Sequence, residues 1–150
     1  MKIDIACGVQ KKPGFTGLDK INAEGVDIVC DCLERLPLED NEVEEVNCGD
    51  FIEHITYHEM IGMMNEIWRV CKNGSKVRIV TVFGIKGWLN HPPHTRPIFT
   101  NQFNYFTPDA VEQPTFNHMR NADGITSVFS VKKNEEDENS NLEFILEVVK

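Results

Sequence analysis

The sequence predicts an α/β protein with a mostly parallel sheet, few helices and a C-terminal antiparallel hairpin. Short strand-like runs rich in β-branched residues recur from Ile3 to Phe83, separated by loops or by one long helical pattern. Two further strand-like runs, Thr126–Lys132 and Leu142–Val149, enclose an acidic polar connection, which is typical of a hairpin. Strands joined through loops and helices favour parallel pairing, whereas the hairpin adds an antiparallel element.

The first four expected strands are short, and each ends at, or is directly followed by, a glycine or an acid. They are Ile3–Cys7, Phe15–Asp19, Val26–Cys30 and Val43–Cys48. Gly8 follows the first strand directly, Pro13–Gly14 marks a turn before the second, and Asp31 follows the third. The fourth is the least regular, because it contains several acids.

One amphipathic helix is expected after these strands. Thr56 and Glu59 have the spacing of a capping box, in which each side chain bonds the backbone N–H of the other residue. Apolar residues then recur at helical spacing and form one stripe: Ile61, Met64, Ile67, Trp68 and Cys71. Asn73–Gly74 is a stop signal, and Lys76–Phe83 (KVRIVTVF) is the clearest strand of the chain.

The second half is less regular. Gly84–Pro108 is expected to be mostly loop, with many aromatic residues that favour an ordered one. Asp109–Phe116 is expected to contain a short helix broken at Pro114. No internal repeat and no domain boundary is evident, so residues 1–150 are expected to form a single domain.

Composition and hydropathy indicate which class of partner and which cellular compartment to expect. The net charge of −9 repels phosphate backbones, so a nucleic-acid partner is not expected, while a small-molecule partner is compatible with it. No apolar run is long enough to span a bilayer, and the first residues carry no apolar signal region, which predicts a cytoplasmic protein without membrane contact. The oligomeric state stays open.

No metal site is predicted. Five cysteines form an odd set in apolar segments, which is typical of buried thiols in a reducing compartment. Cys30 and Cys32 have no second pair to complete a zinc site. His54 and His58 lie four residues apart, but no Glu follows the first, so the metalloprotease pattern fails and a capping or packing role is expected for His54.

The carboxyl ends of the expected strands carry the residues suited to binding a ligand. In a mostly parallel sheet, ligands bind beyond these ends, near the point where the strand order reverses. Gly8 lets a ligand approach backbone N–H groups closely, and Asp19 can accept both hydroxyls of a ribose. The two residues are too close in sequence for an intervening helix and a dinucleotide fingerprint, so NAD or FAD is not favoured.

Five motifs in order resemble class I S-adenosylmethionine-dependent methyltransferases, especially a compact methyltransferase type 11-like group. IDIACGVQKKPGFTGLD at Ile3–Asp19 is similar to LDLGCGxxKKPGFxGxD. The other four stretches resemble family motifs in the same order: VDIVCDCLERLPLEDNEVEEV, CGDFIEHI, MNEIWRVCKNGSKVRIV and NHPPHTRPIFTNQFNYF. The resemblance covers almost the whole chain and implies a Rossmann-like fold, S-adenosylmethionine as cofactor and methyl transfer as activity.

The resemblance also implies site residues. Ala6, Cys7 and Gly8 would line the methionine part of the cofactor, and Asp19 would hold the ribose hydroxyls. The adenine would be surrounded by Asp31, Cys32 and Leu33. The pocket beside the sulfonium would be closed by Cys48 and Gly49. Ala6 stands where the family has glycine, Asp50 where it often has histidine, and His91 where the substrate-loop pattern has aspartate.

His94 and Arg96 match the substrate loop of the family, and Glu53 and His54 match its acid–histidine pair. His94 is the candidate general base, since imidazole accepts a proton near neutral pH, and Arg96 is the candidate substrate clamp. Both residues are equally compatible with hydrogen-bonded anchors of a loop.

Three functions remain open at this level. The first is methyl transfer to a small-molecule acceptor such as a sugar or metabolite. The second is a catalytically silent S-adenosylmethionine-binding or scaffold protein, for which Ala6 is the motive. The third is a different nucleotide-binding or interaction protein.

Overall fold

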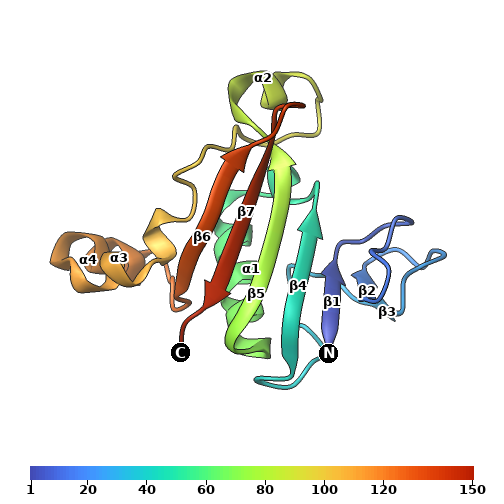
Figure 1. Ribbon diagram of the computed structural model, residues 1–150, viewed down its shortest axis with the longest axis horizontal. Coiled ribbons are helices and arrows are strands. Elements are labelled where there is room, and N and C mark those ends of the chain that lie inside the picture. The colour runs from blue at the N-terminus through green and yellow to red at the C-terminus, as the bar shows by residue number, and fades with distance from the viewer.

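The computed structural model describes all residues from Met1 to Lys150 and shows one seven-stranded mixed sheet (Figure 1). The spatial order is β3-β2-β1-β4-β5-β7-β6. The strands are β1 (Lys2–Ile5), β2 (Thr16–Asp19), β3 (Ile28–Val29), β4 (Val43–Gly49), β5 (Cys71–Val82), β6 (Phe129–Glu136) and β7 (Asn141–Val148). β1 to β5 pair in parallel, and β7 is antiparallel to both β5 and β6, so the predicted fold class is confirmed.

The strand order reverses at β1. The chain moves outward from β1 to β2 and β3, and then returns to the other side of β1 to form β4 and β5. In sheets of this kind the crevice for a ligand lies at the carboxyl ends of the strands beside the reversal. Here those are the ends of β1, β2 and β4.

Helix α1 (Tyr57–Val70) covers one face of the sheet (Figure 1). It begins with the predicted capping box, since both bonds between Thr56 and Glu59 are present. The residues that it buries follow the predicted stripe: Met60, Ile61, Met63, Met64, Ile67 and Val70. Cys71, expected on the helix, instead begins β5 and pairs with Val43, because β4 continues parallel beside this segment. The helix therefore ends before Asn73–Gly74.

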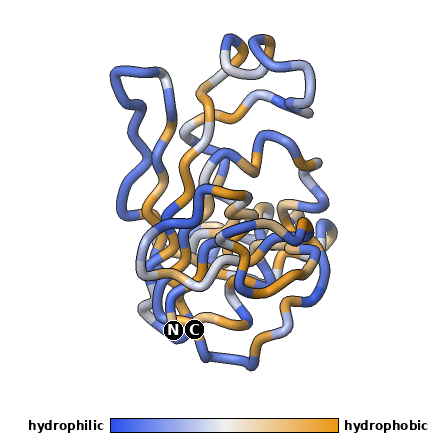
Figure 2. Tube along the Cα trace, turned by 90° about the vertical axis from the view of Figure 1, so that its right-hand side faces the viewer, coloured by the Kyte–Doolittle hydropathy of each residue, from blue (hydrophilic) through white to orange (hydrophobic).

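The opposite face of the sheet is covered by ion pairs rather than by a helix. Because side chains alternate along a strand, Ile3 and Ile5 of β1 face the core while Lys2 and Asp4 face away. On this face Lys2 pairs with Glu45 at 2.6 Å, and Glu143 accepts from Arg78 and from Lys133, each at 2.6 Å. Hydrophobic segments, drawn orange in Figure 2, gather in the centre of the molecule, where 28 buried residues form one core.

The segment Gly84–Pro108, expected to be mostly loop, contains α2 (Gly84–Leu89) and the 3-10 turn η2 (Asn104–Phe106). Most of the segment is loop, as expected, but the sequence reasoning did not single out α2, because two glycines in six residues weaken its helix signal. The aromatic residues of Gly84–Pro108 order this segment, since Phe103 and Phe106 are fully buried against the core.

Pro114 marks the boundary between two short helices. The structure has α3 (Pro108–Glu112) and α4 (Pro114–Ala122), each with proline in its first turn. Proline lacks a backbone N–H, which costs nothing there because a first-turn N–H has no partner within the helix. The expected short helix corresponds to α3, which ends at Glu112 before Pro114, whereas α4 was not expected. None of the helices in the molecule is long and apolar enough to cross a membrane.

The C-terminal hairpin is present with shifted bounds. Thr126 and Ser127 donate their backbone N–H groups to the Asn65 side chain of α1, each at 3.1 Å, so β6 begins only at Phe129. The tight turn is closed by Asp137, which accepts the N–H groups of Asn139 and Asn141. As a result β6 extends to Glu136, into the expected connection.

Candidate functional site

Two cavities lie at the carboxyl ends of β1, β2 and β4, one on each side of Ala6. The first, of about 350 Å³, is lined by Ala6, Asp19, Lys20, Asp31, Cys32, Leu33, Phe51, His54, Ile55 and Glu59. The second, of about 340 Å³, is lined by Asp4, Ala6, Cys7, Gly8, Val9, Gln10, Asn47, Gly49 and Asp50. Ala6 lines both, so the two cavities together form one elongated site around the end of β1. Their size is that of small-molecule sites.

A loop, with no helix, joins β1 to β2 and sets the position of Asp19. Gly8 donates its backbone N–H to Asp19 Oδ2 at 2.9 Å, and Ile21 donates to Oδ1 at 3.0 Å. These bonds hold the carboxylate at the edge of the first cavity. Each carboxylate oxygen has more than one acceptor position, so Asp19 keeps capacity for hydroxyl donors of a ligand.

The same loop is strained at Ala6. Ala6 has φ 53° and Gly8 has φ 51°, both in the left-handed region. Glycine adopts this region freely, but an alanine there costs about 1 kcal/mol because of its Cβ. Asp50, at the end of β4, also has positive φ, at 51°. The backbone therefore turns sharply on both sides of the second cavity.

Asp4 is a residue of the site that the sequence reasoning missed. It is 3% exposed, accepts the Lys12 backbone N–H at 2.7 Å and accepts from Asn47 Nδ2 at 2.7 Å. Its carboxylate thus ties the loop after β1 to β4 and lines the second cavity. The available signal was an acid between two isoleucines of a strand that is otherwise apolar.

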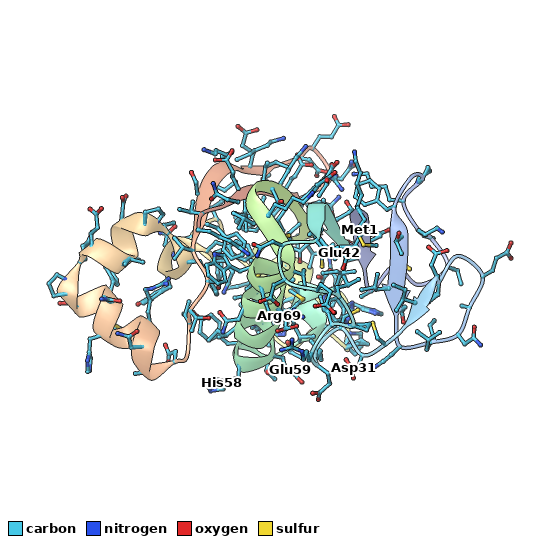
Figure 3. The ribbon with its side chains drawn as sticks, turned by 90° about the horizontal axis from the view of Figure 1, so that it is seen from below. Met1, Asp31, Glu42, His58, Glu59 and Arg69 are labelled. Carbon is cyan, nitrogen blue, oxygen red and sulfur yellow. The ribbon has the colours of Figure 1, made fainter.

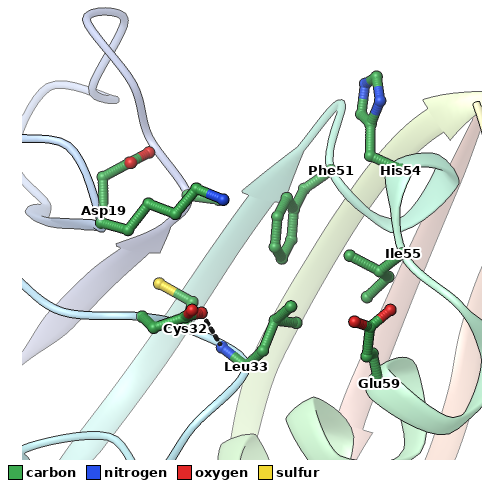
Figure 4. Close-up of a pocket in the computed structure, with 10 residues that line it drawn as sticks. Asp19, Cys32, Leu33, Phe51, His54, Ile55 and Glu59 are labelled. Atoms are coloured by element: carbon green, nitrogen blue, oxygen red, sulfur yellow. Dashed lines mark hydrogen bonds between the residues drawn. The ribbon is translucent and has the colours of Figure 1, made fainter. Parts of the chain in front are cut away.

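In the first cavity Asp19 lies opposite Phe51 and Ile55, which His54 and Glu59 flank (Figure 4). Asp31 accepts the backbone N–H of Leu33 at 2.9 Å, which fixes the turn after β3. Phe51 and Ile55, from the segment between β4 and α1, form the apolar wall. Burial raises the pKa of the Cys32 thiol to about 12, so this thiol stays protonated and is not a nucleophile.

Lys20 and Glu59 were also missed. Lys20 follows β2, and Glu59 belongs to the capping box of α1. Glu59 and Asp31 line the same cavity from different elements, and both are labelled in Figure 3 beside the start of α1. Glu59 was expected only to cap α1, and its position in the site is additional to that role.

Most of the residues expected to bind the cofactor meet at this site, with Cys48 as the exception. Asp19, Asp31, Cys32 and Leu33 line the first cavity, Cys7, Gly8 and Gly49 line the second, and Ala6 lines both. Cys48 is fully buried in the core and lines neither cavity, because its position in β4 directs its side chain to the face that α1 covers.

Arg96 lies against η1 (Ile52–His54) and the residue that follows it. Its Nε donates to the Ile55 carbonyl at 3.3 Å, and its Nη2 lies 3.4 Å from the Ile52 carbonyl and 3.1 Å from Met60 Sδ. Burial lowers the pKa of the Arg96 guanidinium. These contacts make Arg96 an anchor of the loop, and its role as a substrate clamp stays a prediction.

His94 packs beside His54 at the outer end of the first cavity. The ring centroids of His54 and His94 are 4.8 Å apart, and those of His91 and His94 are 5.0 Å apart. His54 lines the first cavity, whereas His94 is not among the residues that line it. Glu53 is 1% exposed and accepts from Thr81 Oγ1 at 2.8 Å. His58, four residues from His54, is exposed and takes no part in this group.

Comparison with known proteins identifies the family. A family model described as "Methyltransferase domain" matches residues 4–79, which is just over half of the chain. The chain belongs to this methyltransferase family. The matched residues include β1, β2, β3, β4 and α1, and therefore nearly every wall of both cavities.

Solved structures with the same fold agree with this assignment. A Pyrococcus horikoshii protein is 18% identical, with a TM-score of 0.63 over 98% of this chain and 81% of that one. A SAM-dependent methyltransferase from Archaeoglobus fulgidus is 14% identical, with a TM-score of 0.65 over 97% of this chain and 85% of that one. Phosphoethanolamine N-methyltransferase 1 of Haemonchus contortus, solved with phosphoethanolamine and S-adenosylhomocysteine, is 11% identical, with a TM-score of 0.68 over 99% of this chain and 38% of that one. A search of curated proteins by sequence gave no match.

S-adenosylmethionine is the cofactor of this methyltransferase, and the residues present fit it. The first cavity offers a carboxylate suited to ribose hydroxyls beside an apolar wall suited to a base. The second offers two carboxylates and the close backbone of Gly8 and Gly49, which suit the amino-acid end of the molecule.

Proposed function

We propose that this methyltransferase transfers a methyl group from S-adenosylmethionine to a small-molecule acceptor, such as a sugar or another metabolite. The observation that carries the proposal is the pair of cavities that meet at Ala6, with the Asp19 carboxylate fixed by Gly8 at their edge. An elongated ligand with a ribose in its middle matches this arrangement.

The bound cofactor supplies a methyl group on a sulfonium, which is already activated for displacement. The protein therefore has to align the acceptor with that methyl group and keep water away from it. Asp19 would hold the ribose, Asp31 and the backbone of Leu33 the adenine, and the turn at Ala6–Gly8 the methionine end. Phe51 and Ile55 contribute the apolar wall that excludes water.

The acceptor would approach from the side of His54, at the end of the first cavity. For a hydroxyl acceptor, His94 is the proposed general base. Its Nδ1 lies 2.8 Å from the Gly87 carbonyl, which can only accept, so the proton resides on Nδ1 and Nε2 carries a free lone pair. The net charge of −9 supports a small acceptor over a nucleic acid.

Calorimetry with S-adenosylmethionine and S-adenosylhomocysteine is the first test. We expect one binding site for each, lost or strongly weakened in Asp19→Ala. Incubation with cofactor labelled in the methyl group and a metabolite pool should then give a labelled small molecule. Absence of cofactor binding in the folded protein would refute the proposal.

A catalytically silent cofactor-binding protein is the second candidate, and the left-handed Ala6 favours it. The Cβ methyl group of Ala6 occupies the place at this turn where the cofactor is expected to approach the protein backbone. Cofactor binding without label transfer to any acceptor pool would favour this candidate over the enzyme.

A further inference from the structure

Two histidines and a buried acid meet next to the first cavity, although they come from distant parts of the chain. Glu53 and His54 belong to η1, and His94 belongs to the loop after α2. One side-chain ligand atom of each lies within 4.8 Å of those of the other two. Such a group is small enough to surround a single metal ion after small side-chain adjustments.

The chemistry of these groups selects a class of ion. Two imidazoles and one carboxylate are the ligands that zinc and related divalent transition metals prefer, whereas magnesium and calcium prefer oxygen ligands alone. Three protein ligands also leave a coordination position for water or for a substrate atom, which is typical of catalytic rather than structural zinc sites.

Two hydrogen bonds already orient the ligand groups. His94 donates from Nδ1 to the Gly87 carbonyl at 2.8 Å, which leaves Nε2 free to bind an ion. Glu53 accepts from Thr81 Oγ1 with Oε2, which leaves Oε1 free. Metal-ligating histidines and carboxylates are usually fixed by such outer contacts.

The two segments are also held together without help from the histidines. Thr95 donates its backbone N–H to the Glu53 carbonyl at 2.8 Å and its hydroxyl to the Ile55 carbonyl at 2.8 Å. Trp88 donates from its indole N–H to the His94 carbonyl at 3.1 Å. The distance between η1 and His94 is thus set by the fold, so an ion would bind to groups that are already in place.

We propose that Glu53, His54 and His94 form a binding site for a divalent transition-metal ion of the zinc class, open toward the first cavity. His54 lines that cavity, so the remaining coordination position faces the side from which the acceptor enters. This last point rests on the proposed function: an oxygen of the acceptor bound to the ion would lose its proton more readily. The ion would then replace His94 as the means of activating the acceptor.

Titration of chelator-treated protein with Zn²⁺ tests the site, with Co²⁺ as a spectroscopic probe. We expect one ion per chain and a Co²⁺ spectrum of nitrogen and oxygen ligands without thiolate charge transfer. His54→Ala and His94→Ala should abolish binding. Thr81→Val, which removes only the outer hydrogen bond, should weaken it roughly 10- to 100-fold.

His118→Ala is the matched control, because His118 is an exposed histidine on α4 and should leave the stoichiometry unchanged. Thermal unfolding and S-adenosylhomocysteine binding of each variant show whether it is folded and whether the cofactor site is intact. This separates failure of the metal site from failure of the proposed function. No binding of Zn²⁺ to the folded protein, or binding that persists in His94→Ala and is lost in Cys30→Ser, would overturn the proposal.

Discussion

The residues around the end of β1 and the histidine group beside the first cavity are built in different ways. We call Ala6–Gly8, Asp19 and Asp31–Leu33 the cofactor edge, and Glu53, His54, His91 and His94 the histidine edge. The cofactor edge consists of residues that directly follow parallel strands and are fixed by short-range bonds such as Gly8 to Asp19. The histidine edge joins η1 to a loop about 40 residues further along the chain, through bonds from Thr95 and Arg96.

This difference has a functional meaning. The cofactor edge depends on strand order and on a few local turns. The histidine edge depends on tertiary contacts of one particular loop, and in the proposed function it lies on the acceptor side. Cofactor binding and acceptor chemistry should therefore respond to separate substitutions.

The largest effect is expected at the cofactor edge. Asp19→Ala removes the carboxylate that we assign to the ribose hydroxyls and leaves Gly8 N–H without its partner. Hydrogen bonds to a charged group contribute about 1.5–3 kcal/mol, so S-adenosylhomocysteine affinity should fall roughly 10- to 100-fold by calorimetry. Zn²⁺ binding should not change, and Asp123→Ala, an exposed acid after α4, should affect neither.

Arg96→Ala should act on the histidine edge alone. The change removes a half-buried guanidinium that bonds the Ile55 carbonyl and approaches the Ile52 carbonyl, and should lower the free energy of unfolding by about 1–3 kcal/mol. Urea unfolding measures this, with exposed Arg35→Ala as a control that should change little. Unchanged stability together with weaker acceptor binding would instead favour the substrate-clamp role.

Ala6→Gly should stabilise the cofactor edge. Glycine relieves the left-handed strain at φ 53°, a gain of about 1 kcal/mol and roughly 2–4 °C in Tm. Ala23→Gly is the matched control, because Ala23 has no positive φ and the added chain entropy should lower its stability. A lower Tm for Ala6→Gly would contradict the strain that we assign to this turn.

The smallest effect concerns pH and the start of α1. Backbone and side-chain hydrogen bonds from Thr56 lower the pKa of Glu59. The folded pKa is below the unfolded one, so the contribution to stability is full above the unfolded pKa and is lost as the pH falls through the folded pKa. The Tm difference between the protein and Glu59→Gln should therefore shrink as the pH is lowered from 7 to 3. A constant difference would argue against a charged cap.

The sequence predicted the fold well because its strands and α1 follow from local patterns. The residues of the cofactor edge were implied by the family resemblance; the structure brings them to one site, and their contacts with the cofactor stay a prediction. Gly8, Asp19 and Asp31 mark strand ends that can be recognised from the sequence alone. The capping box at Thr56 and the apolar stripe of α1 are equally local. Asp4 was missed, since an acid within a strand gives no sign of the amide and backbone groups that it will meet.

The histidine edge could not be predicted in the same way. Spacing drew attention to His54 and His58, which share a helix start, whereas the structure places His94 beside His54. Nothing in the pattern reports that Thr95 will bond the carbonyls of η1. The sequence reasoning likewise did not anticipate α2 and α4, because glycine and proline weaken a helix signal that tertiary packing can overcome.

The absence of a helix between β1 and β2 has a consequence for turnover. Asp4 and Asn47 direct the second cavity to the ion-paired face of the sheet, away from α1 and the histidine edge. In the proposed function, the amino-acid end of the cofactor would thus lie on a different face of the molecule from the acceptor. We expect the spent cofactor to leave without any opening of the loop around His94, so its departure and the exchange of acceptor can proceed at independent rates.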